Sequence, residues 1–119
     1  MTDTIAIRKK VAALCGFTGD ITYIHEPFKT VLKGFKFGLQ IPIPHFDTSL
    51  DAITKVFDEH GLTWTLEKRL DEEHDEIVYF ALSDKHHGFS NRSNGAAMAM
   101  CYLFIKLMEA NKKARLNNP

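Results

Sequence analysis

Cysteine is scarce in this sequence. The chain has 119 residues and only two cysteines, Cys15 and Cys101, which lie far apart in apolar stretches. So few cysteines exclude a disulfide framework, and their apolar surroundings favour buried free thiols in a reducing compartment. We therefore expect the protein in a cytoplasm.

An excess of charge of either sign is also missing. Fifteen lysines and arginines balance 15 aspartates and glutamates, so the formal net charge is zero. This balance excludes the general electrostatic footprint of a nucleic-acid-binding protein and argues against nucleic acid as a partner. It also removes the repulsion that keeps copies of a small protein apart, so we expect a homo-oligomer.

The sequence has no apolar run long enough to cross a membrane. The apolar stretch at residues 95–105 is much shorter than the ~20 residues that a bilayer-spanning helix needs. Near the N-terminus, Arg8, Lys9 and Lys10 interrupt the apolar residues, and no small-residue cleavage site follows a continuous apolar run. We therefore expect neither a membrane contact nor a signal peptide.

The motifs of common enzymes and metal sites are absent as well. The sequence has no Walker loop, no GxGxxG and no HExxH. His86 and His87 are adjacent, so their side chains point apart and are poorly placed to bind a metal together with His74. The acidic run at residues 71–76 lacks the spaced carboxylates and the glycine of a calcium loop. We expect no enzymatic activity, no cofactor and no metal.

The hydrophobic pattern predicts a first helix over residues 3–15. Ile7 and Val11 recur at helical spacing, while Arg8 and the lysines after it are turned mostly outward. Gly16 is suited to end this helix, because glycine adopts the left-handed conformation without strain.

Two strands are predicted in the segment that follows. Apolar and polar residues alternate at residues 21–25 and again at residues 35–43, and this period of two is typical of strands. Pro42 and Pro44 indicate that the second strand ends at a sheet edge or in an extended arm.

A second helix and a hairpin are predicted next. Thr48 is suited to cap this helix, Asp47 adds negative charge near its positive end, and Gly61 is suited to end it. Strands at residues 62–67 and 77–82 then form an antiparallel hairpin with an acidic tip in solvent. Trp64, in the first of these strands, is expected in the core.

The last predicted helix begins near Ser93 or Asn94 and runs to about Lys113. Small residues at its start, including Ala99, allow a close approach to a sheet. No linker or internal repeat interrupts the pattern. The sequence therefore predicts one domain over residues 1–119, of the α+β class.

Several of these features together resemble the phage ABA sandwich domain, a family of small phage and prophage proteins. The resemblance rests on Gly16 and Phe17 after the first helix, the segment at residues 46–49 before the second, Trp64 in a strand, and an alanine-rich closing helix that carries Cys101. It implies a layered α/β/α sandwich with a small, mainly antiparallel sheet and about three helices. It implies no activity, cofactor or catalytic residue, and it places the protein in a bacterial host cell.

One candidate site lies just before the last helix. Backbone N–H groups at a helix N-terminus, together with a guanidinium, can hold an anionic ligand such as a nucleotide. The alternative is an exposed loop over residues 85–94 whose serine or asparagine only caps the helix. The candidate ligand-binding residues are His86, His87, Ser90, Asn91, Arg92, Ser93 and Asn94.

A second candidate site combines lysines with aromatic residues, which is the composition of a surface for single-stranded nucleic acid. The alternative is an edge hairpin in which the lysines discourage edge-to-edge pairing and the aromatic rings pack inward. The residues are Lys29, Lys33, Phe35, Lys36 and Phe37.

Three hypotheses on function remain open. The first is a non-enzymatic phage or prophage accessory protein that binds a host or phage protein partner and self-associates. The second is a protein that sequesters a small anionic ligand or nucleotide with the Arg92 loop. The third is a binder of single-stranded nucleic acid.

Overall fold

The computed structural model describes residues 4–26, 29–91 and 95–117. Within these residues one helix, three strands, a second helix, three more strands and a third helix follow one another along the chain. The helices are α1 (Thr4–Leu14), α2 (Leu50–Glu59) and α3 (Gly95–Asn117), and the strands are β1 (Thr18–Glu26), β2 (Lys29–Lys36), β3 (Leu39–Pro42), β4 (Thr65–Asp71), β5 (Glu76–Ser83) and β6 (His86–Asn91).

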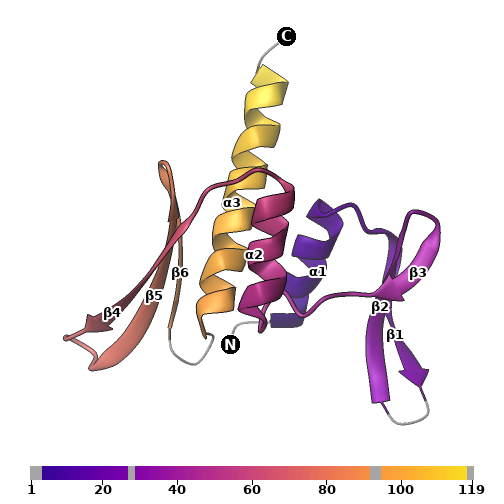
Figure 1. The fold of residues 1–119 in the computed structure, drawn as a ribbon, viewed down its shortest axis with the longest axis horizontal. Coiled ribbons are helices and arrows are strands. Elements are labelled where there is room, and N and C mark those ends of the chain that lie inside the picture. Colours follow the sequence, from indigo (N-terminus) through magenta and orange to yellow (C-terminus); the bar gives the residue numbers. More distant parts are fainter. Residues whose placement is uncertain (1–3, 27–28, 92–94, 118–119) are drawn as a thin grey trace.

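The strands form two antiparallel sheets, one of order β1-β2-β3 and one of order β4-β5-β6. The α+β class, the three helices and the antiparallel pairing that the sequence predicts are confirmed. The strands divide between two sheets where one small sheet was expected. In Figure 1 the helices lie between the two sheets, with α3 against β5 and β6, so the helices and not a sheet are in the middle.

The sheet formed by β1, β2 and β3 projects from the helices, and we call it the arm (Figure 1). The molecule measures 47 × 45 × 24 Å and its radius of gyration is 15.6 Å. A compact domain of this length has a radius of gyration of about 13.5 Å. The molecule is therefore more extended than a compact domain of this length.

The hydrophobic core centres on α3. Val11 of α1 and Ile53 and Phe57 of α2 are fully buried, and the ring of Phe57 contacts that of Phe104 edge-on at 5.7 Å between centroids. Trp64 is partly buried and packs against this core, as predicted. Of the described helices, none offers the length of apolar surface that a bilayer crossing requires.

A close contact between β6 and α3 joins the second sheet to the core. Gly88 of β6 faces the backbone of α3, and a Cβ atom added to it would lie 2.2 Å from the carbonyl oxygen of Ala99. Only glycine fits at this distance. This contact agrees with the expectation that small residues at the start of α3 allow a close approach to a sheet. The small residue on the strand is Gly88.

The first two helices end at the predicted glycines, but the N-terminal capping residue of α2 is not the predicted one. Gly16 and Gly61 have φ of +99° and +66°, the left-handed values that favour glycine after a helix. At the start of α2 the capping residue is Ser49, whose hydroxyl accepts a hydrogen bond of 3.2 Å from the Ala52 N–H. The prediction of Thr48 as the cap is wrong by one residue.

Arg8 is buried, so the prediction that it points outward is wrong. Its Nε and Nη2 donate to the two carboxylate oxygens of Asp47, at 2.6 and 3.2 Å. Both side chains are removed from solvent. The pair ties α1 to the segment before α2, because a buried charge needs a partner of opposite sign. Asp47 therefore forms a buried ion pair with Arg8, in addition to its position near the N-terminus of α2.

The predicted strand at residues 35–43 is instead a hairpin. Phe37 and Gly38 have φ of +56° and +76°, and Lys36 pairs with Leu39, which defines a two-residue turn of type I′. The turn separates β2 from β3 and reverses the chain. The predicted strand at residues 62–67 also moves: β4 starts at Thr65, and the hairpin with β5 and its exposed acidic tip are otherwise as predicted.

The predicted loop at residues 85–94 is largely a strand. Residues His86–Asn91 pair with β5 along their whole length as β6. The loop prediction is therefore wrong over these residues, and residues 92–94 lie outside the described part of the chain.

Candidate interaction surface

The predicted ligand-binding residues do not converge in the part of the chain that is described. His86 and His87 are neighbours on β6 and so project from opposite faces of the sheet. Ser90 is buried, and its hydroxyl donates to the Gly95 carbonyl at the start of α3. Asn91 is half-buried at the end of β6. The remaining candidates, Arg92, Ser93 and Asn94, lie outside the described residues.

The lysine and phenylalanine set is divided by the pleat of β2. Lys33 and Phe35 are two residues apart and share one face, whereas Lys36 lies on the other. The Lys36 ammonium stands over the ring of Phe17, 5.4 Å from its centroid, and 5.5 Å from that of Phe37. Lys29 occupies the first position of β2, and its side chain is not described. The arrangement is not a single face of alternating cations and rings.

The turn of the arm exposes apolar side chains. Phe37 is 90% exposed and Leu39 is 66% exposed. Phe37 is a residue of the β2–β3 turn with a positive φ, and the Lys36 ammonium contacts its ring. We call Lys36, Phe37 and Leu39 the arm surface.

A cavity of about 390 Å³ opens beside the arm surface. Lys36 lines this cavity and also contacts Phe37, so the cavity adjoins the exposed turn. The walls are mainly apolar, and Lys36, Lys55 and Glu59 bring charges to its lining. The other lining residues come from the end of α1, the arm, the segment between β3 and α2, and α2: Cys15, Phe17, Ile41, Pro42, Pro44, Phe46, Ala52 and Val56.

Neither thiol in this region is activated. Burial raises the pKa of Cys15 to about 11, against an opposing effect of the Lys36 charge. Burial also raises the pKa of Cys101, whose Sγ donates to the Phe46 carbonyl at 3.1 Å. Because the thiolate is the nucleophilic form, these raised pKa values leave both thiols protonated at neutral pH.

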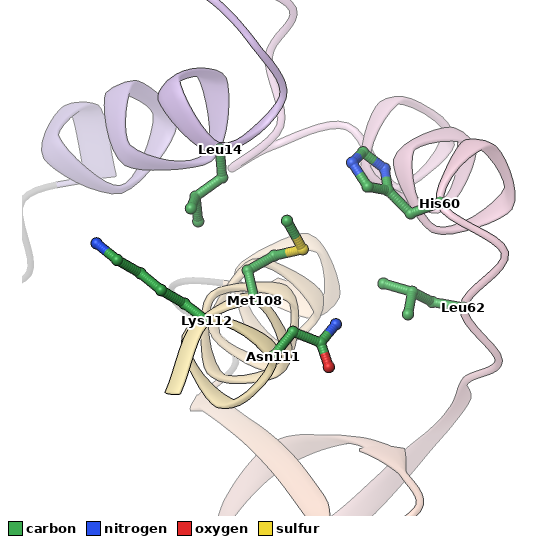
Figure 2. A pocket seen from close by; sticks show the side chains of 6 residues that line it. All are labelled: Leu14, His60, Leu62, Met108, Asn111 and Lys112. Carbon is green, nitrogen blue, oxygen red and sulfur yellow. The ribbon is translucent and has the colours of Figure 1, made fainter. Parts of the chain in front are cut away.

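A second cavity of about 340 Å³ lies where the three helices meet at the ends of α1 and α2 (Figure 2). Leu14 and Met108 point toward each other across it, and Leu62 extends the apolar wall. His60 lines it too, and its Nδ1 bonds to the Val56 carbonyl at 2.9 Å. Lys112 provides a cation at the rim. This cavity has an apolar wall but brings no nucleophile and base together.

Asp71 is hydrogen-bonded within the acidic hairpin tip. Nδ1 of His74 lies 2.9 Å from Oδ2 of Asp71, and this hydrogen bond holds the pKa of Asp71 below its usual value. The backbone N–H of Glu73 donates to the other oxygen of Asp71 at 3.2 Å. Asp71, Glu73 and His74 each have a ligand atom within 4.8 Å of the others. The hydrogen bonds of a tight turn account for this grouping.

The cavity beside the arm was not predicted from the sequence. Its residues come from four separate segments, so no spacing along the chain identifies them. The exposed turn was detectable in one respect, because Phe37 is followed by Gly38, and a glycine between two apolar runs is a turn signal.

No protein-family model and no curated protein matches the chain. The chain does share its fold with a phage protein from Bacillus cereus ATCC 14579, known from a crystal structure. The two superpose with a TM-score of 0.56 at 15% sequence identity, over 88% of this chain and 91% of that one. The fold is therefore one that a phage protein adopts, and membership of the ABA sandwich family stays a prediction.

Proposed function

We propose that this protein is a phage or prophage accessory protein that catalyses no reaction and acts by binding a protein partner through the arm surface. The shared fold with the Bacillus cereus phage protein supports the phage origin. The raised pKa of Cys15 and of Cys101 argues against catalysis by a cysteine nucleophile.

The exposure of Phe37 is the observation that carries the proposal. Burying a phenylalanine side chain is worth about 1.5–3 kcal/mol, yet this ring is 90% exposed at the end of a projecting hairpin. Aromatic residues beside a pocket are typical anchors of protein interfaces, where a few residues supply most of the binding free energy. A partner that covers Phe37 and Leu39 gains this burial and can place a side chain in the adjoining cavity.

Lys36 limits which partner fits. Its ammonium contacts the rings of Phe17 and Phe37 and lines the cavity. An ammonium held by two rings loses less conformational freedom on binding than a free lysine does. It favours a partner segment with an apolar anchor next to a carboxylate. The nucleotide and single-strand hypotheses have weaker support, because the residues proposed for each are divided between faces or lie outside the described residues.

The test is site-specific photo-crosslinking in the cells that produce the protein. Benzoylphenylalanine at Phe37 keeps an aromatic ring at that position, and the same residue at His74, on the exposed acidic tip, is the control. We expect a discrete cross-linked protein from position 37 that is absent from position 74. The adduct should disappear when Leu39→Ser is added.

The outcome that refutes the proposal is equally specific. No adduct from position 37, or adducts only to further copies of this chain, would mean that the arm surface does not bind a separate protein. Circular dichroism of each purified variant shows whether the fold is retained. This matters because the turn residue at position 37 has a positive φ.

A further inference from the structure

The sheet formed by β4, β5 and β6 has one face against α3 and one face open. Gly88 and Ser90 of β6 are buried on the α3 side. Phe89 lies between them in the sequence, so it projects from the opposite face, where it is 48% exposed. The strand register places Phe80 directly opposite Phe89, and Glu67 opposite Phe80. Side chains of all three strands therefore share the open face.

A cluster of interacting side chains covers the centre of this face. The rings of Phe80 and Phe89 lie 5.2 Å apart in a tilted arrangement, and the Arg69 guanidinium stands 4.6 Å from the centroid of Phe80. Arg69 Nε also donates to the Glu67 carboxylate at 2.8 Å. We call Glu67, Arg69, Phe80 and Phe89 the open sheet face. Its aromatic centre and fixed guanidinium are typical of interface anchors.

We propose that a second copy of this chain packs on the open sheet face, so that two sheets meet around a two-fold axis. Such an interface is self-complementary, since each copy offers the same surface. The centre of the face carries Arg69 and Glu67, one charge of each sign, and a two-fold axis lets Arg69 of each copy approach Glu67 of the other. The formal net charge of zero leaves no long-range repulsion between copies. This inference is independent of the arm surface.

The charges of this face favour a second copy over single-stranded nucleic acid. Exposed rings beside an arginine also suit base stacking. However, the register places Asp71 and Glu76 opposite each other at the end of the same face as Glu67. Three carboxylates against one guanidinium repel phosphates anywhere along this face. In the dimer the Arg69 and Glu67 pair at the centre can exchange partners with an identical face, and Asp71 and Glu76 stay at the end of the sheet.

The size of the face indicates a weak, reversible dimer. Its strands have seven, eight and six residues, which gives a footprint of about 23 by 14 Å, or roughly 320 Å² for each copy. A standard stable interface buries about 800 Å² from each partner. We therefore expect a dissociation constant of roughly 10 to 500 μM, in the range of transient complexes.

Sedimentation velocity from about 5 μM to 1 mM, which spans this affinity range, tests the proposal. The wild-type chain should shift from monomer to dimer, and Phe89→Ser should weaken the dimer by roughly tenfold or more, since it removes an anchor that the monomer leaves half exposed. Phe37→Ser is the matched control, because it alters the arm alone and should leave the dimer unchanged.

A charge swap identifies the interface. Arg69→Glu and Glu67→Arg each place like charges across the two-fold axis and should weaken the dimer by roughly tenfold. The double variant Glu67→Arg with Arg69→Glu restores opposite charges, and its arginine faces Phe80 from position 67, so the dissociation constant should return to within about threefold of wild type.

Three results would overturn the proposal. These are a strict monomer at 1 mM, a dimer that Phe89→Ser and Arg69→Glu leave unchanged, and salt-dependent retention on single-stranded DNA that Phe89→Ser abolishes without any wild-type dimer. Failure of cross-linking from position 37 bears only on the arm surface, so the two proposals fail separately.

Discussion

Replacing Gly88 with alanine should be the most damaging single-methyl change in the second sheet. The added Cβ would lie 2.2 Å from the Ala99 carbonyl oxygen and 2.6 Å from the Leu103 backbone nitrogen, where ordinary contacts begin near 3.4 Å. Both neighbours are backbone atoms of α3, so no side chain can rotate away. The strand and the helix must separate by roughly 1 Å, and overpacking of this kind costs about 3 kcal/mol.

The free energy of unfolding from urea denaturation measures this cost. For a domain of this size, about 3 kcal/mol corresponds to a fall in melting temperature of roughly 10 °C. Gly61→Ala is the control, because Gly61 has a positive φ but no heavy atom within 4 Å of the added Cβ. It should cost only about 1 kcal/mol, through backbone strain alone.

Ala99→Gly should fail to rescue the Gly88→Ala variant. If the Gly88→Ala clash involved the Ala99 side chain, Ala99→Gly would relieve it. Because the clash is with the Ala99 carbonyl, the double variant should be no more stable than Gly88→Ala, and the glycine should cost about 1 kcal/mol more within the helix. A loss for Gly88→Ala no larger than that for Gly61→Ala, or a rescue by Ala99→Gly, would refute the close approach of β6 to α3.

Two further predictions concern buried charge and protonation. Asp47→Ala leaves the Arg8 guanidinium buried without its carboxylate and should lower the free energy of unfolding by about 3–5 kcal/mol, whereas Glu109→Ala, which breaks an exposed pair with Lys10, should cost less than about 1 kcal/mol in the same assay. Equal losses would contradict the burial of the first pair. The pKa of Cys15 rises from 9.0 to about 11 on folding, so its contribution to stability is complete below pH 9 and is lost as the pH rises through 11. Cys15→Ala should therefore show a smaller fall in urea midpoint between about pH 8 and 10.5 than wild type, and an identical fall would contradict the raised pKa.

Local signals made much of the fold predictable. The glycines at positions 16 and 61 end helices because the conformation after a helix favours a residue without a Cβ, and this preference is visible in the sequence. The β4–β5 hairpin was predictable from its apolar strands and acidic tip. In each case the decisive residues are neighbours along the chain, so their spacing carries the information.

The missed features depend on contacts between distant segments. Arg8 stands in a run of basic residues, and only Asp47, 39 positions away, makes its burial favourable. Strand β6, with the sequence HHGFSN, has little strand propensity of its own. It forms because β5 offers an edge and because Gly88 fits against α3. The turn at Phe37 was missed because a non-glycine residue at positive φ is rare.

The same contacts explain why the predicted ligand site was difficult to assess from sequence. Its histidines, glycine and serine suggested a loop rich in hydrogen-bonding groups, but pairing with β5 divides these side chains between the two faces of a sheet. Gly88 and Ser90 then hold α3, and Phe89 is left on the open face with Phe80 and Arg69. A segment chosen for its polar residues therefore contributes most to binding, under our proposal, through its one aromatic residue. Because alternation along a strand decides which side chains reach a partner, assigning β6 as a strand changes the expected partner from a small anion to a second protein surface.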